Sequence, residues 1–268
     1  MQSIRIVFVD LDGTLLSSSH QILDSSEYAI SELIRQNIHV VVTTGRSVSG
    51  MKEAVKSLPF NLQAPISVHN GALILDRQKK IAHKVILEKE AMVALVQEAR
   101  RQNIHMGFQS DFDTYIEGEM GKYEWVYKLH GIEPVLVDDL LGLDIELIKV
   151  SFYGEEDRIS SLLEFYHHEA DVERVSLFRS GMYYADATAK KATKLESAQW
   201  ITKALDIPAE QVLAIGDQFN DIEMLQWAEV GVAMGNADKD VKCIADFVTK
   251  TNDDHGIFHA LKSHGLLQ

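Results

Sequence analysis

The first third of the chain alternates mainly apolar runs with an amphipathic stretch, and this alternation constrains the fold more than any other feature. One apolar run spans 4–9 and a second spans 38–42. Between them, the spacing of Asp24 and Glu27 predicts a helix that begins with a capping box, and apolar residues then recur at a roughly helical period. Strands that are apolar on both faces are typical of parallel sheets covered by helices. The pattern therefore predicts a βαβ unit.

The last third of the chain repeats this alternation, whereas the middle differs. Expected helices lie near 194–205 and 221–228, and expected strands near 212–215, 231–233 and 247–248. In the middle, aromatic and charged residues are interleaved, and helical stretches are expected near 89–102 and 155–168. We therefore predict an α/β protein whose core domain consists of 1–82 and 188–268, with a separate α+β domain inserted at 83–187.

Composition indicates an ordinary globular protein. Its 268 residues, 46% of them hydrophobic and 25% charged, suffice for one large domain or two moderate ones. The single cysteine, Cys243, excludes an intramolecular disulfide, and no Cys/His cluster has zinc-ligand spacing. The first apolar run is short and ends at Asp10, which suits neither a signal peptide nor a membrane helix. We expect a cytoplasmic protein with no membrane partner.

The charge balance limits the partners. The net charge is −14, from 26 basic and 40 acidic residues, and the chain has no Lys/Arg-rich block. Binding to nucleic acid is therefore not expected. An anionic substrate would be repelled at long range, so any phosphate site must supply positive charge locally, from a cation or a placed lysine. The sequence carries no signal of oligomeric state.

Polar residues cluster where the predicted strands end. The clusters are "DLDGT" at 10–14, "TTGRS" at 43–47, the lysine of "KKATKLESA" at 194 and "IGDQFNDIEML" at 215–225. Each alone has an ordinary explanation as a turn, a strand end or a helix cap. However, ligands bind at the carboxyl ends of the strands in parallel sheets. Together, the clusters would place carboxylates, a hydroxyl, an ammonium and an amide around one crevice.

These four clusters resemble the four motifs of the haloacid dehalogenase superfamily, and specifically its Cof-type sugar phosphatases. The GDxxND pattern at 216–221 is the most specific of them, and "SVHNGA", "GVAMGNA" and "TKTNDDHGI" also match. The resemblance implies a Rossmann-like core with an α/β cap inserted between the second and third motifs. One departure is that Leu195, not glycine, follows the third-motif lysine. Lys190 and Lys191 lie nearby, but Lys194 aligns best.

The resemblance implies a phosphatase that uses Mg²⁺ and hydrolyses a small phosphorylated metabolite, such as a sugar phosphate. Asp10 would attack phosphorus and form an aspartyl-phosphate, and Asp12 would act as general acid and base. The Mg²⁺ ligands would be Asp10, the backbone carbonyl of Asp12, and Asp217. The groups that bind the phosphoryl oxygens would be the amides of Leu11 and Gly45, the Thr44 hydroxyl, Lys194 and the Asn220 amide.

Several questions stay open at this point. Asp221 either orients the metal shell or Lys194, or caps the helix that starts there. A phosphomutase or other phosphotransferase on the same fold is an alternative function, and a phospho-accepting signalling module is a second. The inserted segment is expected to be a mobile cap that selects the substrate. Its polar and aromatic residues include Phe108, Asp111, Tyr115, Glu117 and Arg179.

Overall fold

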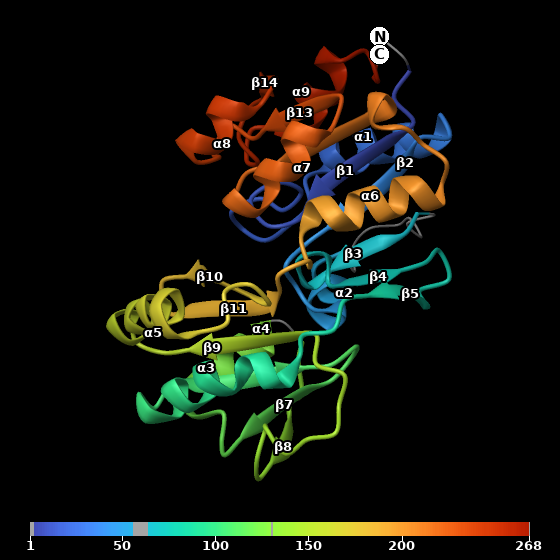
Figure 1. The fold of residues 1–268 in the computed structure, drawn as a ribbon. Coiled ribbons are helices and arrows are strands. Elements are labelled where there is room, and N and C mark those ends of the chain that lie inside the picture. Colours follow the sequence, from blue (N-terminus) through green and yellow to red (C-terminus); the bar gives the residue numbers. More distant parts are fainter. Residues whose placement is uncertain (1–2, 56–63, 130, 268) are drawn as a thin grey trace. The chain divides into compact units, whose positions relative to one another are not determined.

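The computed structural model describes residues 3–55, 64–129 and 131–267, which form two compact units (Figure 1). The first unit comprises the described residues within 1–45, 54–83 and 193–268, and the second those within 46–53 and 84–192. This grouping differs from the sequence-based division in placing 46–53 and 188–192 with the second unit and residue 83 with the first. The assignment of 83–187 as a cap domain stays a prediction.

The first unit is built on one sheet. Among the described residues this sheet has eight strands, in the order β14-β13-β12-β1-β2-β3-β4-β5. Their bounds are β1 (Ile6–Asp10), β2 (His39–Thr43), β3 (Ile66–Val68), β4 (Leu73–Leu75), β5 (Ile81–Lys84), β12 (Val212–Gly216), β13 (Val230–Ala233) and β14 (Phe247–Val248). Strands β14 to β3 run parallel, and β3 pairs antiparallel with β4. Every residue of β1 and β12 is buried, as expected of strands covered on both faces.

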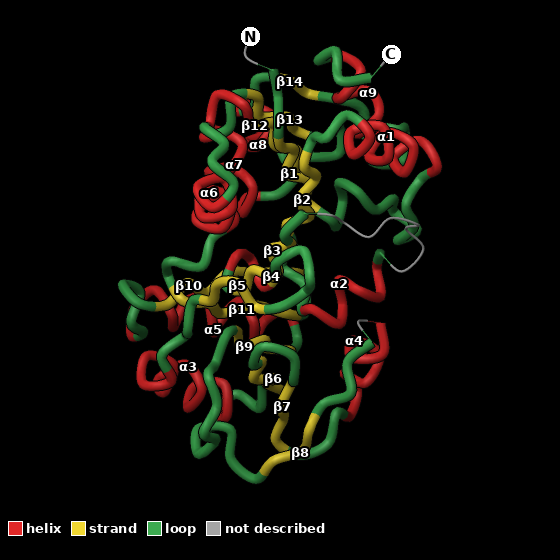
Figure 2. The backbone as a smooth tube through the Cα atoms, turned by 90° about the vertical axis from the view of Figure 1, so that its right-hand side faces the viewer, coloured by secondary structure: helices red, strands yellow, loops and turns green. Residues whose placement is uncertain are grey.

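Helices cover both faces of this sheet (Figure 2). On one face lie α1 (Asp24–Arg35) and α9 (Gly256–Ser263), and on the other α6 (Lys194–Ala204), α7 (Ile222–Trp227) and α8 (Lys239–Ile244). Short 3-10 turns connect several elements, namely η1 (His69–Gly71), η3 (Ala209–Gln211) and η4 (Phe219–Asp221). The predicted α/β fold is confirmed.

The predicted capping box at the start of α1 is wrong. Leu23 is the residue that precedes the helix, and no side chain caps it there. Asp24 is already the first helical residue, so its side chain cannot take the capping position. Asp24 and Glu27 instead lie in the first turn, where negative charge is stabilised by the helix dipole.

The second unit has a different sheet. Among the described residues it has six strands, in the order β10-β11-β9-β6-β7-β8, and all neighbours pair antiparallel except β7 and β8. Their bounds are β6 (His105–Gln109), β7 (Thr114–Glu117), β8 (Val135–Val137), β9 (Lys149–Tyr153), β10 (Val175–Gly181) and β11 (Tyr184–Ala189). The helical elements are α2 (Val48–Ala54), α3 (Lys89–Arg101), η2 (Gly121–Tyr123), α4 (Glu124–Leu129) and α5 (Glu156–Glu169). The helices expected at 89–102 and 155–168 are therefore present.

The two faces of this second sheet differ in chemistry. Alternation along the strands puts Phe108 and Phe152, both fully buried, on one face. The other face carries a connected set of buried polar groups. There, Gln109 Nε2 donates to Ser151 Oγ at 2.9 Å, and Ser151 Oγ donates to Asp186 Oδ1 at 2.5 Å.

We find no helix in the described parts of the chain that has both the length and the apolar character needed to cross a membrane.

Candidate active site

The candidate site lies at the carboxyl ends of the central strands of the first unit. Asp10 is the last residue of β1 and is level with Thr43, the last residue of β2. On the other side of β1, Gly216 ends β12 and Asp217 follows it. Because these strands are parallel, the chain segments that leave them emerge at the same edge of the sheet.

Buried acids cluster around one buried lysine at this edge. Carboxylate oxygens of Asp10, Asp217 and Asp221 all lie within 4.8 Å of one another, and all three residues are buried. Lys194 is 1% exposed, and its Nζ donates to Asp10 Oδ1 at 2.5 Å and to Asp221 Oδ1 at 2.6 Å. Lys190 and Lys191, in contrast, are exposed. The structure thus brings together the first, third and fourth motifs.

The electrostatics reflect this crowding. Burial raises the pKa of the Asp10 carboxyl well above its usual range, although the Lys194 ammonium opposes the shift. Burial also raises the pKa of Asp217 to about 6, although Asp217 Oδ1 accepts a hydrogen bond from the Thr14 hydroxyl at 2.7 Å. Burial alone would lower the pKa of Lys194, but Asp10 and Asp221 outweigh it and raise that pKa. The cluster therefore holds less positive charge, from Lys194, than negative charge, from its three acids.

This donor set fits a hard divalent cation. Mg²⁺ takes oxygen ligands, commonly one or two carboxylates together with water and substrate phosphate. Asp10 and Asp217 supply carboxylate oxygens at the strand ends, and a bound cation would offset the excess negative charge. The adjacent turn is also closely fitted, because a Cβ added at Gly13 would lie 2.3 Å from Asp217 Oδ2. The backbone carbonyl of Asp12 stays a predicted ligand.

Of the two roles that the sequence left open for Asp221, the structure supports the orientation of Lys194, whereas the expected side-chain cap of the following helix is wrong. Its Oδ1 accepts from Lys194, while its Oδ2 accepts from the backbone N–H groups of Asp217 and Gln218 at 3.1 and 3.0 Å. With Gln218 it forms a capping box around η4, so it caps this 3-10 turn and not α7. Both of its carboxylate oxygens are therefore engaged by the protein, and Asp221 holds the lysine and the loop after β12 in place.

The turn after β1 carries the other first-motif residues. Leu11 is fully buried, and Asp12 is half-buried. The turn closes on itself, because Leu15 N donates to Asp10 O at 3.2 Å and Leu16 N donates to Leu11 O at 2.8 Å. These contacts fix the main path of the turn. The roles expected of Asp12 and of the Leu11 amide stay predictions.

Asn70 contacts both the second-motif residues, Thr44 and Gly45, and Asn220 of the fourth motif. Thr44, which is 1% exposed, accepts a hydrogen bond at its backbone O from Asn70 N at 2.9 Å. Asn220 Nδ2 donates to Asn70 Oδ1 at 2.9 Å. A Cβ at Gly45 would lie 3.0 Å from Asn70 Oδ1, so this position has little room for a side chain. Thr44, Gly45 and Asn220 are thereby brought together.

Sequence reasoning treated Asn70 only as a mark of family resemblance. Its backbone has a left-handed conformation, with φ of 56°, at the carboxyl end of β3. Asparagine tolerates this conformation better than most residues. In the sequence, the Asn-Gly pair of "HNG" directly after an apolar run indicated a turn with left-handed backbone conformation.

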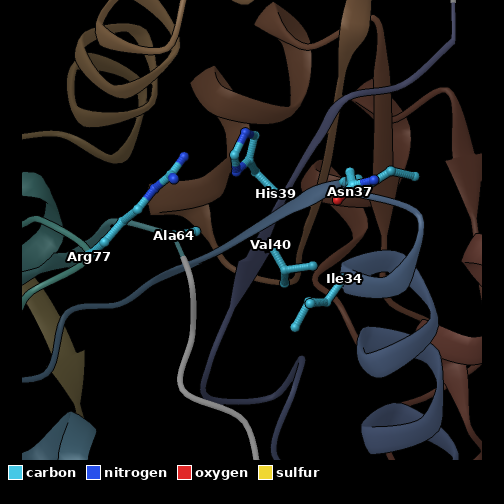
Figure 3. Close-up of a pocket in the computed structure, with 7 residues that line it drawn as sticks. Ile34, Asn37, His39, Val40, Ala64 and Arg77 are labelled. Carbon is cyan, nitrogen blue, oxygen red and sulfur yellow. The ribbon is translucent and has the colours of Figure 1, made fainter.

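A hollow of about 210 Å³ lies elsewhere in the first unit (Figure 3). It is lined by Ile34, Asn37, Ile38, His39, Val40, Ala64 and Arg77. His39 begins β2, so this hollow is at the opposite end of the strand from Thr43 and the acid cluster. Burial, together with Arg77 and Arg5, lowers the pKa of His39. None of the predicted site residues lines it.

Comparison with known proteins supports the resemblance inferred from the motifs. A sequence profile of a family described as haloacid dehalogenase-like hydrolase matches residues 7–261. Phosphatase YwpJ of Bacillus subtilis is 28% identical, with 96% of this chain and 99% of that protein covered. The 5-amino-6-(5-phospho-D-ribitylamino)uracil phosphatase YcsE of B. subtilis is 27% identical, with 97% and 95% covered.

A solved structure is similar over the same extent. The subclass IIB sugar phosphatase BT4131 of the same superfamily superimposes with a TM-score of 0.84 at 25% identity, covering 98% of this chain and all of that one. The similarity therefore extends over both units of the chain.

Proposed function

The chain belongs to the haloacid dehalogenase-like hydrolases, and we propose that it is a Mg²⁺-dependent phosphatase that cleaves a small sugar phosphate through an aspartyl-phosphate. One observation carries this proposal: the buried Lys194 ammonium is held between Asp10 and Asp221, beside Asp217, at the carboxyl ends of parallel strands. Relatives that are named phosphatases support the reaction class. A structural relative that is named a sugar phosphatase supports the substrate class.

Asp10 and Asp12 divide the chemistry. An Asp10 carboxylate oxygen attacks phosphorus, and the bond between phosphorus and the substrate oxygen breaks as the Asp12 carboxyl protonates that oxygen. Water then attacks the aspartyl-phosphate while the Asp12 carboxylate accepts its proton, which releases phosphate and restores Asp10. Mg²⁺ held by Asp10 and Asp217 would supply positive charge for the phosphoryl oxygens.

The remaining polar groups bind and orient the phosphoryl group. The Lys194 ammonium supplies fixed positive charge in a buried place, where electrostatic stabilisation is strong. The Thr44 hydroxyl and the amides of Leu11 and Gly45 donate hydrogen bonds to phosphoryl oxygens. Asn220 gives one of its side-chain N–H groups to Asn70, which leaves the second for the substrate.

Phosphate release tests this function and separates it from the two alternatives. The purified protein with Mg²⁺ is supplied with p-nitrophenyl phosphate and with a panel of phosphorylated metabolites. A phosphatase releases inorganic phosphate over many turnovers. A phosphomutase would instead yield a positional isomer of the sugar phosphate, and a signalling module would stop at one stable phosphoryl group per chain. Either of those outcomes would overturn the proposal.

We further propose that the second unit selects the substrate. The chain order supports this, because the second motif precedes most of this unit and the third motif follows it. Of the residues that sequence analysis named there, Phe108 is fully buried and therefore does not contact a sugar, and Glu117 is held in an ion pair with Arg100. Exchanging 84–192 for the equivalent part of phosphatase YwpJ should change the ranking of substrates and preserve the Mg²⁺ requirement. An unchanged ranking would contradict the proposal.

A further inference from the structure

The segments "GVAMGNA" and "TKTNDDHGI" each contain an asparagine, Asn236 and Asn252, to which the proposed reaction assigns no role. Asn236 lies in the loop after β13, and Asn252 in the loop after β14. Both belong to the first unit, and both loops leave strands that run parallel to β1. They therefore lie at the same edge of the sheet as Asp10.

The two side-chain amides bind the turn after β1, and the Asn236 side chain also binds the backbone of Asn252. Asn236 Nδ2 donates to the backbone O of Gly13 at 2.8 Å, and Asn252 Nδ2 donates to the backbone O of Leu16 at 2.8 Å. Asn236 Oδ1 in turn accepts from the backbone N of Asn252 at 2.9 Å. The two asparagines are thus hydrogen-bonded to each other and hold the turn at two points, Gly13 and Leu16.

Gly13 is the place where this turn most needs support. Its φ is +79°, and glycine has more backbone freedom than any other residue. It directly follows Asp12 and precedes Thr14, whose hydroxyl donates to Asp217. A change in the Gly13 peptide would therefore move the Asp12 backbone relative to Asp217 and Asp10.

We propose that Asn236 and Asn252 are positioning residues that fix the turn from Gly13 to Leu16 and so hold the Asp12 carboxyl in place for proton transfer. This inference rests on the proposed function. It assigns the pair to the placement of Asp12, whose role as acid depends on the leaving group. The value of kcat/KM reports this role alone, because it covers the reaction only up to departure of the leaving group and not the later attack of water. Loosening the pair should therefore slow reactions that need the acid more than reactions that do not.

The test compares Asn252→Ala and Asn236→Ala with the wild type on two aryl phosphates of similar shape. Phenyl phosphate has a poor leaving group that needs the acid, whereas p-nitrophenyl phosphate has a good one. General acid catalysis contributes typically ~10²–10⁴-fold, so partial misplacement of Asp12 should lower kcat/KM for phenyl phosphate about tenfold. The expected loss for p-nitrophenyl phosphate is at most about threefold, because it draws little on the acid.

Gln36→Ala is the matched control. Gln36 Nε2 donates to the backbone O of Leu266 at 2.9 Å, so it is also a side-chain amide bound to a backbone carbonyl, but it lies just after the end of α1. Its substitution should leave both kcat/KM values within about twofold, as most surface substitutions have small effects. Thermal unfolding of all three variants tells a loss of fold from a loss of positioning.

Each outcome decides the question. A fall in kcat/KM that is larger for phenyl phosphate than for p-nitrophenyl phosphate, in either asparagine variant, supports the inference. An equal fall for both substrates, or no fall, overturns it and leaves the proposed function intact. A wild type that releases phosphate from neither ester overturns the proposed function itself, and this inference with it.

Discussion

Each unit has a buried lysine in contact with aspartate, but the two sites differ in their balance of positive and negative charge. In the first unit, the Lys194 ammonium faces Asp10 and Asp221 at 2.5 and 2.6 Å, with Asp217 beside them. In the second unit, Lys149 Nζ lies 3.4 Å from Asp186 Oδ1, and both residues are less than a tenth exposed. Among the described residues, the first cluster thus holds three acids against one lysine, whereas the second holds a single pair.

The surroundings explain what each arrangement does. Asp186 Oδ1 also accepts from Ser151 and its Oδ2 accepts from Ser180 at 2.8 Å, so its charge is satisfied within the sheet. A satisfied buried pair stabilises one packing arrangement and leaves little capacity for a ligand. The strand-end cluster in the first unit keeps unbalanced negative charge. The difference teaches that charge imbalance, and not burial of ions as such, distinguishes the candidate active site from the pair in the second unit.

The largest expected effect is the loss of turnover on replacing aspartate by asparagine in the first site, compared with the same replacement in the second. Asp10→Asn should abolish turnover of p-nitrophenyl phosphate, because it removes the proposed nucleophile. Asp186→Asn, which is the matched control in the second unit, should keep kcat within a few-fold. Release of p-nitrophenol measures both. Comparable loss in the two variants would mean that the comparison of the sites is wrong.

Removal of divalent metal is expected to have the next largest effect. Exhaustive treatment with EDTA should stop turnover, and added Mg²⁺ should restore it, since the acid cluster needs a cation. Mg²⁺ should also raise the thermal midpoint of the wild type, because a ligand that binds only the native state stabilises it. The rise should be smaller in Asp217→Asn. Full activity after EDTA would remove the metal from the proposal.

Asp12→Asn should leave a slow enzyme. The loss in kcat should be about 10²–10⁴-fold for a substrate with a poor leaving group, which is the usual size of general acid-base catalysis. With p-nitrophenyl phosphate, phosphoryl transfer to Asp10 should still occur while hydrolysis is slowed, so the aspartyl-phosphate should accumulate. Mass spectrometry of acid-quenched protein detects the covalent adduct. The division of roles fails if Asp12→Asn and Asp10→Asn have equal residual rates and neither shows an adduct.

The balanced pair in the second unit should matter for stability. Lys149→Met leaves the Asp186 carboxylate buried without its lysine, and breaking a buried pair in this way costs about 3–5 kcal/mol. Urea unfolding measures the free energy of unfolding. Combining Lys149→Met with Asp186→Asn should recover part of the loss, because the buried charge is then gone. If Lys149→Met alone had the same free energy of unfolding as the wild type, the buried pair would not contribute to stability in this way.

The smallest expected effect is a pH dependence in the second unit. Burial lowers the pKa of His105, whose Nε2 lies 2.8 Å from the Tyr127 hydroxyl oxygen. The unfolded state therefore binds the proton more strongly, so stability is full above the unfolded pKa of about 6.5 and falls as pH drops below it. Between pH 7.5 and 5.5, His105→Gln should lose less unfolding free energy than the wild type. Equal losses would exclude His105 as the titrating group.

The sequence by itself determined several helices and strands of this protein and the residues at the strand ends of the first unit. The periods of apolar residues located β1, β2 and α6 to within two residues at each end, because a strand buried on two faces and a helix buried along one stripe have different spacings of apolar residues. The motifs at 10–14 and 215–225 identified the acids that the structure brings together. Parallel strand order makes such residues neighbours without further information.

Only the tertiary structure decided which side chains act on one another. Asn252 binds Leu16, 236 residues away, and Asn220 binds Asn70, 150 residues away. Such contacts depend on how loops from different strands meet, which no local pattern encodes. The capping box at Asp24 was wrong for the same kind of reason, since one residue of shift in where a helix begins changes which side chain can reach its free N–H groups. The spacing of apolar residues thus determined where the strands lie, and the packing of the loops determined which side chains are hydrogen-bonded to one another.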